Sequence, residues 1–221
     1  VPRKNLRLID GKPLVVWAVD TARAARSVTR TIVSTDDEEI AEVAARAGAE
    51  APFLRPAAIS GDASTDLEVF THALEWLRTH EAYVPDVCVH LRPTYPLRTP
   101  DDVDRVVELL TTMPDIDSVR SVCSTAETPF KMWFKNDEDI LTPVLASGSR
   151  ELHNLPRQVL PQVFVQNAAV DAVWTRVVTD LRSMTGATVC AYVMDGNFDI
   201  DTEADLERVS RLMAARRPDQ P

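Results

Sequence analysis

The chain has 221 residues, of which 45% are hydrophobic and 26% are charged, a length that fits one domain at roughly 100–200 residues per domain. Its 24 Lys and Arg against 34 Asp and Glu give a net charge of −10, which excludes a general nucleic-acid binder because phosphate binding needs a positive surface. No apolar run approaches the about 18–20 residues of a membrane span, so we expect no membrane partner. Three widely spaced cysteines indicate neither a disulfide scaffold nor a zinc site, and we predict a cytoplasmic location.

Short apolar runs alternate with amphipathic segments along the chain. In chain order we expect a helix over 14–25, a strand over 31–33, helices over 40–47 and 67–77, a strand over 86–91, a helix over 103–110, strands over 118–122 and 188–194, and a helix over 206–212. Thr35 precedes Glu38 at capping-box spacing, and Thr99 precedes Pro100 as a cap before an N1 proline. The alternation predicts a three-layer α/β/α fold with a mostly parallel, Rossmann-like sheet, whose ligands bind past the carboxyl ends of the strands.

Residues 127–166 do not follow this alternation of strands and helices. They contain four prolines and short apolar runs, which predict extended segments and loops. We interpret this excursion from the single domain 1–221 as a subunit contact or a lid.

The first residues contain no strand that could feed the helix over 14–25. A parallel α/β sheet needs such a strand, and we therefore expect one upstream of Val1.

Three polar segments have residue types suited to phosphate and metal chemistry. Lys4 and Asn5 lie in a probable loop, and the segment 91–98 places two arginines directly after the best strand. Asp199 and Asp201 are two residues apart, so in extended chain their carboxylates point to one side and suit Mg²⁺. Simple helix capping by Asp201 or Thr202 is the competing interpretation. Capping alone also explains the polar turns at 34–37 and 62–66.

Taken together, these motifs match one family in order and spacing. They are Lys4-Asn5, the run Ile-Val-Ser-Thr-Asp-Asp at 32–37, Leu-Arg-Pro at 54–56, Arg-Pro-Thr at 92–94 with Pro-Leu-Arg at 96–98, and Asp-Ile-Asp at 199–201. Over essentially its whole length the chain resembles the acylneuraminate cytidylyltransferases, the CMP-sialic acid synthetases. The resemblance implies a single nucleotidyltransferase domain that transfers CMP from CTP to an acidic sugar, with Mg²⁺ as cofactor. It also implies a homodimer, and a Gly-rich phosphate loop upstream of Lys4.

The resemblance also implies a role for each matched residue. It assigns Asp199 and Asp201 to the metal, and these two with Lys4 and Arg98 to catalysis. The residues that it assigns to CTP are Lys4, Asn5, Arg55, Ser64 and Thr94. Those assigned to the acceptor are Arg92, Lys131, Arg157, Gln166 and Asn167, with Lys131 and Arg157 lent across the dimer by the excursion.

Four departures from the family pattern lie in or near the implied acceptor pocket. Arg92 stands for Gln, Tyr95 for Ser, Ala168 for Gly and Asp171 for Tyr. We infer that the nucleotide chemistry is retained and that the acceptor differs from N-acetylneuraminate, as another nonulosonic acid or a phosphonate would. We expect Arg92 to pair with this anionic acceptor; the alternative is internal neutralisation of Arg92 by Asp171.

Two other functions stay open at this point. One is the same chemistry on Kdo, as in a CMP-Kdo synthetase. The other is a non-catalytic nucleotide-binding module, which the absence of a Gly-rich loop would favour.

Overall fold

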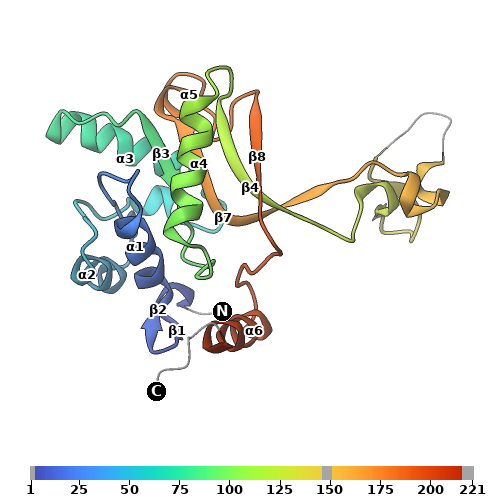
Figure 1. Cartoon of the computed structure of the whole chain (residues 1–221), viewed down its shortest axis with the longest axis horizontal. Coiled ribbons are helices and arrows are strands. Elements are labelled where there is room, and N and C mark those ends of the chain that lie inside the picture. Colours follow the sequence, from blue (N-terminus) through green and yellow to red (C-terminus); the bar gives the residue numbers. More distant parts are fainter. Residues whose placement is uncertain (1–2, 146–150, 216–221) are drawn as a thin grey trace.

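A four-stranded sheet in the order β3-β7-β4-β8 forms the centre of the computed structural model, which describes residues 3–145 and 151–215 (Figure 1). Its strands are β3 (Val87–His90), β4 (Ser118–Ser124), β7 (Phe164–Trp174) and β8 (Val189–Val193). β7 runs antiparallel to both β3 and β4, and β4 runs parallel to β8. Three strands therefore share one direction, as predicted, and β7 is a reversed strand that the sequence pattern did not predict.

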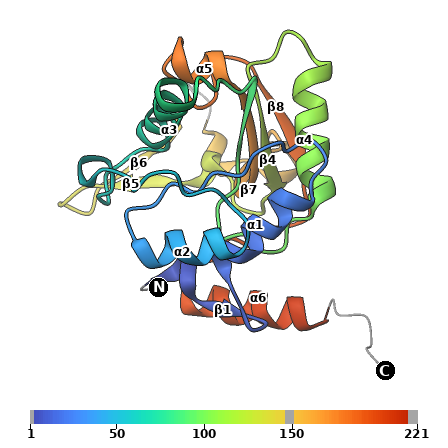
Figure 2. The ribbon, with the colours of Figure 1, turned by 90° about the vertical axis from the view of Figure 1, so that its left-hand side faces the viewer.

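Helices cover both faces of this sheet, as Figure 2 shows for α3 and α4. The helices are α1 (Leu14–Ala24), α2 (Glu38–Arg46), α3 (Asp66–Glu81), α4 (Pro100–Thr112), α5 (Thr175–Thr179) and α6 (Glu203–Ala215). On one face Val103 and Val106 of α4 pack in a cluster with Ala172 of β7. On the other face Leu74 of α3 packs in a cluster with Val173. Successive residues of a strand point to opposite faces, so the predicted three-layer α/β/α fold is confirmed.

The strand expected over 31–33 does not form in the described residues. This segment makes one isolated parallel bridge, between Ile32 and Glu50. Two short hairpins complete the strands, β1 (Leu8–Ile9) with β2 (Lys12–Pro13), and β5 (Trp133–Lys135) with β6 (Leu141–Pro143).

Side-chain caps set where the main helices begin. Thr99 and Asp102 form a capping box on α4, with Pro100 at the first turn. The expected cap at Thr35 is wrong, because Asp37 accepts the N–H groups of Glu39 and Ile40 at the start of α2. The Thr35 hydroxyl instead accepts the N–H of Asp37, one step earlier in the same turn.

β4 and β7 continue beyond the body of the molecule into an arm (Figure 1). The two strands still pair at Ser124 and Phe164, and the arm carries the β5–β6 hairpin. It corresponds to the predicted excursion, whose residues 146–150 lie outside the described residues. Among the described residues, no helix combines the length and the apolar character that crossing a membrane requires.

Candidate active site

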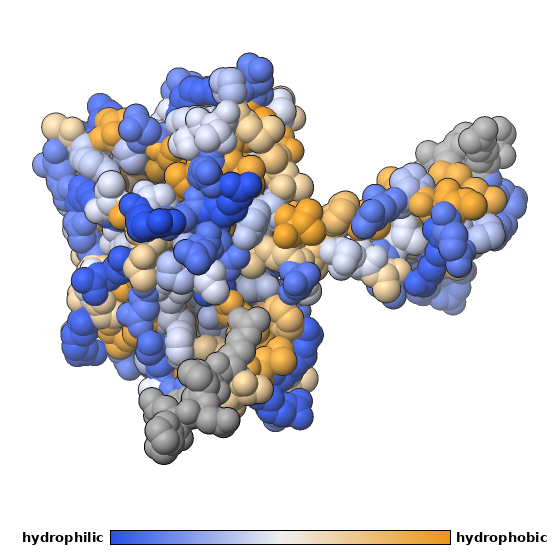
Figure 3. All heavy atoms as spheres, viewed as in Figure 1, coloured by the Kyte–Doolittle hydropathy of each residue, from blue (hydrophilic) through white to orange (hydrophobic). Residues whose placement is uncertain are grey.

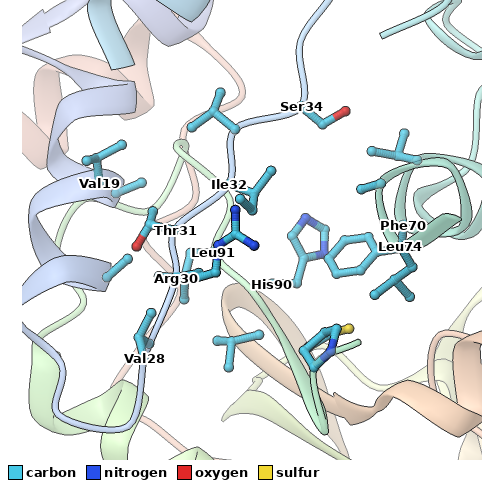
Figure 4. A pocket seen from close by; sticks show the side chains of 18 of the residues that line it. Val19, Val28, Arg30, Thr31, Ile32, Ser34, Phe70, Leu74, His90 and Leu91 are labelled. Carbon is cyan, nitrogen blue, oxygen red and sulfur yellow. The ribbon is translucent and has the colours of Figure 1, made fainter. Parts of the chain in front are cut away.

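A cavity of about 490 Å³ lies between β3, the segment 31–33, α1 and α3. Figure 4 shows Ile32 and Val19 on one side of it, Phe70 and Leu74 on the other, and His90 between them. Within the described residues β3 pairs only with β7, so its other backbone edge faces this cavity. The polar side chains of Asn5, Asp36, Arg55 and Asp66 line the same cavity.

Asp199 and Asp201 are held against the loop that follows β3. The N–H of Ile200 donates to the carbonyl oxygen of Thr94 at 3.0 Å, and the Ile200 side chain is fully buried. The same N–H of Ile200 also donates to Oδ1 of Asp199 at 3.1 Å. Asp201 is exposed, and Nζ of Lys4 lies 3.0 Å from its Oδ1. The structure thus brings together Lys4 and Asp201, which were predicted from opposite ends of the sequence.

Of the two residues named in the capping interpretation, Thr202 is the cap of α6, as that interpretation allowed, and Asp201 is not. The N–H of Asp205 donates to the Thr202 hydroxyl at 3.2 Å, and the N–H of Thr202 donates to the Asp205 carboxylate at 2.8 Å. The Asp201 side chain is 73% exposed, and its one described side-chain ion pair is with Lys4. Two carboxylates with open coordination positions fit Mg²⁺, which commonly takes one or two carboxylates together with substrate phosphates.

Arg98 is buried, with 4% of its surface exposed, and fastens the same loop from inside. Its Nε donates to the carbonyl oxygen of Tyr95 at 2.8 Å, and its Nη2 donates to the carbonyl oxygen of Arg92. Its Nη1 has no hydrogen-bond partner among the described residues, and burial lowers the pKa of Arg98 to about 9. These contacts suit a residue that positions the loop.

The resemblance assigns Arg55 and Ser64 to the cytidine side of CTP. The Arg55 backbone N–H donates to the carbonyl oxygen of Thr35 at 2.8 Å, and its Nη2 donates to Asp36 at 3.2 Å. This pairing ties residue 55 to the end of the segment 31–33. Ser64 lies in the turn before α3, where its N–H donates to the carbonyl oxygen of Gly61 at 3.0 Å.

The Arg92 guanidinium is paired with two carboxylates in this structure. Its Nη1 donates to Asp171 at 3.2 Å and its Nη2 donates to Asp66 at 2.7 Å. Arg120 of β4 donates from Nε and Nη2 to the same Asp171, at 3.2 Å each. We name Asp66, Arg92, Arg120 and Asp171 the ion-pair quartet. Internal neutralisation of Arg92 by Asp171, the alternative left open above, is therefore what the unliganded chain shows, and Asp66 adds a second carboxylate.

His90, the last residue of β3, lies beside the ion-pair quartet. Its Nδ1 is buried, has no hydrogen-bond partner within residues 3–145 and 151–215, and lies 3.7 Å from Oδ2 of Asp66. Burial lowers the pKa of His90 to about 4, and the positive charge of Arg92 contributes to this lowering. The ring is therefore neutral at pH 7.

A wide bulge in β7 shapes the wall next to the ion-pair quartet. β7 pairs with β4 at Asp171 and again at Gln166, and between these pairs the residues 167–170 face Ser121 alone. The Ser121 hydroxyl accepts the N–H of Val170 at 2.9 Å. Asn167 is buried inside the bulge, and its Nδ2 has no partner among the described residues. Bulges of this kind re-aim side chains next to active sites. Gln166, at the rim, accepts Nη1 of Arg120 at 3.0 Å.

Lys131 and Arg157 lie on the arm, where they contact backbone of the arm itself. Nζ of Lys131 donates to the carbonyl oxygen of His153 at 2.9 Å, and Nη1 of Arg157 donates to that of Ala126 at 2.8 Å. The arm extends away from the body (Figure 1), so the described structure does not bring these two cations to the site of their own chain.

Sequence reasoning missed the roles of Asp66 and Arg120. Asp66 had been explained as part of a polar turn, and Arg120 as part of a strand. One signal was available for Arg120, because a lone charged residue within an apolar strand needs a buried partner of opposite charge.

The fold and this site place the protein among nucleotide-binding α/β proteins. A family model described as "Cytidylyltransferase" matches residues 1–138, more than half of the chain. The chain belongs to this cytidylyltransferase family, and the resemblance stated above is confirmed at this level.

Relatives with assigned names fall in the same family. The chain is 35% identical to a pseudaminic acid cytidylyltransferase of Campylobacter jejuni over 108 residues, 49% of this chain and 46% of that protein. It is 32% identical to a CMP-N,N'-diacetyllegionaminic acid synthase of Legionella pneumophila over 109 residues, 49% of this chain and 47% of that protein. In these two matches the chain spans about half the length of the relative. A match of 24% identity to the post-translational flagellin modification protein B of Campylobacter coli covers 96% of this chain and 89% of that protein.

Among solved structures, the fold is similar to that of a CMP:2-keto-3-deoxy-manno-octonic acid synthetase complexed with CTP. The TM-score is 0.69 at 17% identity, covering 98% of this chain and 94% of that one. At this identity the likeness shows the shared fold.

Proposed function

We propose that this chain transfers the cytidylyl group of CTP to a hydroxyl group of an acidic sugar, a nonulosonic acid, and releases pyrophosphate. The observation that carries the proposal is the hydrogen bond from Ile200 to the carbonyl oxygen of Thr94. It holds Asp199 and Asp201 beside the loop after β3, where the family places the nucleotide. The relatives named for pseudaminic and legionaminic acid support the acceptor class.

In this reaction a new bond forms between the sugar oxygen and the α-phosphorus of CTP. The bond from that phosphorus to the pyrophosphate oxygen breaks, and the sugar hydroxyl loses its proton. Such transfers depend on positioning and on charge neutralisation. Lys4 would neutralise phosphate charge, and Arg98 would hold the loop of Thr94 in place. Asp199 and Asp201 would hold Mg²⁺, which supplies neutralisation of the triphosphate and lowers the pKa of the attacking hydroxyl.

The assignment of Asp199 and Asp201 has a direct test. Asp199→Asn and Asp201→Asn should each lower turnover on the order of 100-fold, the loss seen when one stabilising group is removed from an active site. Asp195→Asn is the matched control, an exposed acid in the same loop, and it should keep wild-type turnover. Pyrophosphate release is measured with CTP and a panel of sialic, legionaminic, pseudaminic and Kdo acids and phosphonates. Near-normal activity of either metal-pair variant would refute the assignment, and no turnover with any acid would refute the function.

The proposal includes a β-strand and a phosphate loop upstream of Val1. The cavity supports it, because an extended chain would fit between the edge of β3 and the segment 31–33. The cavity is lined by apolar side chains, including Ile32, Val89 and Phe70, as a buried central strand requires.

The proposal also includes a homodimer and a cytoplasmic location. Large apolar side chains on the arm support a subunit contact, and three free cysteines suit a reducing compartment. Within such a dimer, Lys131 and Arg157 of one protomer would serve the acceptor site of its partner, with Gln166 and Asn167 at its wall.

A further inference from the structure

The ion-pair quartet joins four elements around one buried carboxylate. Arg92 comes from the loop after β3, Arg120 from β4, Asp171 from β7 and Asp66 from the first turn of α3. Two guanidinium groups and two carboxylates make the quartet neutral as a whole. The two carboxylates differ in burial and in the number of hydrogen bonds that they accept from the arginines. This difference indicates which carboxylate a ligand can replace.

Asp171 is the fixed member. Its side chain is 11% exposed, and it accepts one hydrogen bond from Arg92 and two from Arg120. Removing this buried carboxylate would leave Arg120 with only the Gln166 amide and Arg92 with only the half-exposed Asp66, which is costly for partly buried charges. Asp171 therefore stays in place and orients both arginines.

Asp66 is the replaceable member. Its side chain is 49% exposed, and within the quartet it accepts one arginine hydrogen bond among the described residues, from Nη2 of Arg92. Half-exposed ion pairs of this kind are weak and are screened by salt. The helix start does not depend on it, because Thr65 and Glu68 form the capping box of α3.

Without Asp66, the remaining charges of the quartet sum to +1, from two arginines and one aspartate. The outer edge of Arg92 and the unpartnered Nδ1 of His90 both face the position of the Asp66 carboxylate. A planar guanidinium beside a neutral imidazole is suited to an oxyanion, such as a carboxylate or a phosphonate.

We propose that Asp66 occupies, in the unliganded protein, the place that an oxyanion group of the acceptor takes on Arg92. This inference rests on the proposed function and names the part of the acceptor that selects it. Arg92 and Asp66 are then specificity-determining residues, with Arg92 as the donor and Asp66 as an internal competitor.

The test follows the Nε–H signal of Arg92 by NMR in the full chain. N-acetylneuraminate and 2-aminoethylphosphonate, each titrated alone, distinguish a carboxylate source from a phosphonate source, and CTP is titrated as the nucleotide arm. We expect at least one of the two acids to shift the Arg92 signal, and CTP to leave it near its starting position. A shift with CTP alone would overturn the proposal, as would no shift with either acid.

The variant Asp66→Asn removes the competing charge. We expect the dissociation constant of the acid that shifts the signal to fall about three- to fivefold, the range that loss of a weak ion pair allows. Asp101→Asn is the matched control, since Asp101 is a first-turn acid of α4, which also begins with a capping box, and it should leave the constant unchanged. An unchanged or weaker affinity in Asp66→Asn would overturn the proposal.

Two further measurements keep the result independent of folding and of turnover. The thermal unfolding temperature of Asp66→Asn should match that of Asp101→Asn. An acid bound on Arg92 should also shift the Nε–H signal of neighbouring Arg120, and Arg92→Gln should abolish that second shift. These readouts need no catalysis. Failure of pyrophosphate release with every acid would sink the proposed function, whereas failure of the Asp66 competition would sink this inference alone.

Discussion

Ala168 adopts a backbone conformation that favours glycine. Its φ is +59°, in the left-handed region, which disfavours residues with a Cβ. The resemblance places Gly at this position, and the bulge of β7 explains why, since four residues of β7 must fit against one of β4. The chain therefore carries a local strain in the bulge of β7, close in sequence to Asp171 of the ion-pair quartet.

We predict that Ala168→Gly stabilises the protein. The free energy of unfolding should rise by about 0.5 kcal/mol, because relief of the left-handed strain outweighs the entropy that glycine loses on folding. Thermal or urea unfolding measures this change. Ala169→Gly is the matched control: it is a fully buried neighbour with no positive φ, and it should lose about 1 kcal/mol or more. Equal destabilisation by both variants would contradict the strain at residue 168.

At the scale of elements, two neighbouring residues at the start of α6 have different roles: Thr202 stabilises the helix, and Asp201 is the proposed metal ligand. Thr202 caps the helix with Asp205, whereas Asp201 points to Lys4. The two residues are neighbours, yet the structure gives them different tasks.

We predict opposite effects for substitutions at these neighbours. Thr202→Ala should lower the free energy of unfolding by about 1 kcal/mol, the usual value of an N-cap, and should retain most of the pyrophosphate release. Asp201→Asn should retain its unfolding free energy and lose its activity. Paired melting curves and turnover numbers for both variants check this. If Asp201→Asn loses mainly stability, the carboxylate is structural.

The sequence predicted five of the six described α-helices, all but α5, and three of the four strands of the central sheet, because their apolar spacing is a local signal. It did not predict β7, since Asp171 and the bulge interrupt the alternation that identifies a half-buried strand. Asp199 and Asp201 were predicted as a metal pair from their spacing, which is also a local signal. The ion-pair quartet was not found as a whole, because Arg92 and Asp171 are 79 residues apart and Arg120 and Asp171 are 51 apart. Only the fold brings these residues together.

At the scale of the whole molecule, the arm exposes an apolar surface away from the body. Phe134 is 63% exposed, and Ile140 and Leu141 are more than half exposed. Figure 3 shows apolar residues gathered on the arm and where it leaves the body. Large exposed apolar groups on a projecting element are typical of a surface that another subunit covers.

A site shared between protomers makes a quantitative prediction for mixed dimers. An Arg157→Ala chain keeps its own Asp199, but its arm brings no cation at position 157 to the partner's site. An Asp199→Asn chain lacks the carboxylate in its own site, but its arm brings the wild-type Arg157 to the partner's site. In a heterodimer of the two, one of the two sites combines both wild-type halves. Half of the dimers in an equal mixture are heterodimers, so refolded or co-expressed mixtures should recover about a quarter of wild-type pyrophosphate release.

The informative comparison is a second mixture whose defects lie on the same half of the site. Asp199→Asn combined with Asp201→Asn offers no wild-type metal pair in any dimer, so it should stay inactive whatever the subunit exchange. Recovery in the first mixture alone would locate Arg157 opposite the metal pair, across the interface. If both mixtures stay inactive although sedimentation shows dimers, Arg157 acts within its own chain. An active monomer would exclude a shared site, because the arm holds Arg157 on the backbone of Ala126, on an element that extends away from its own site.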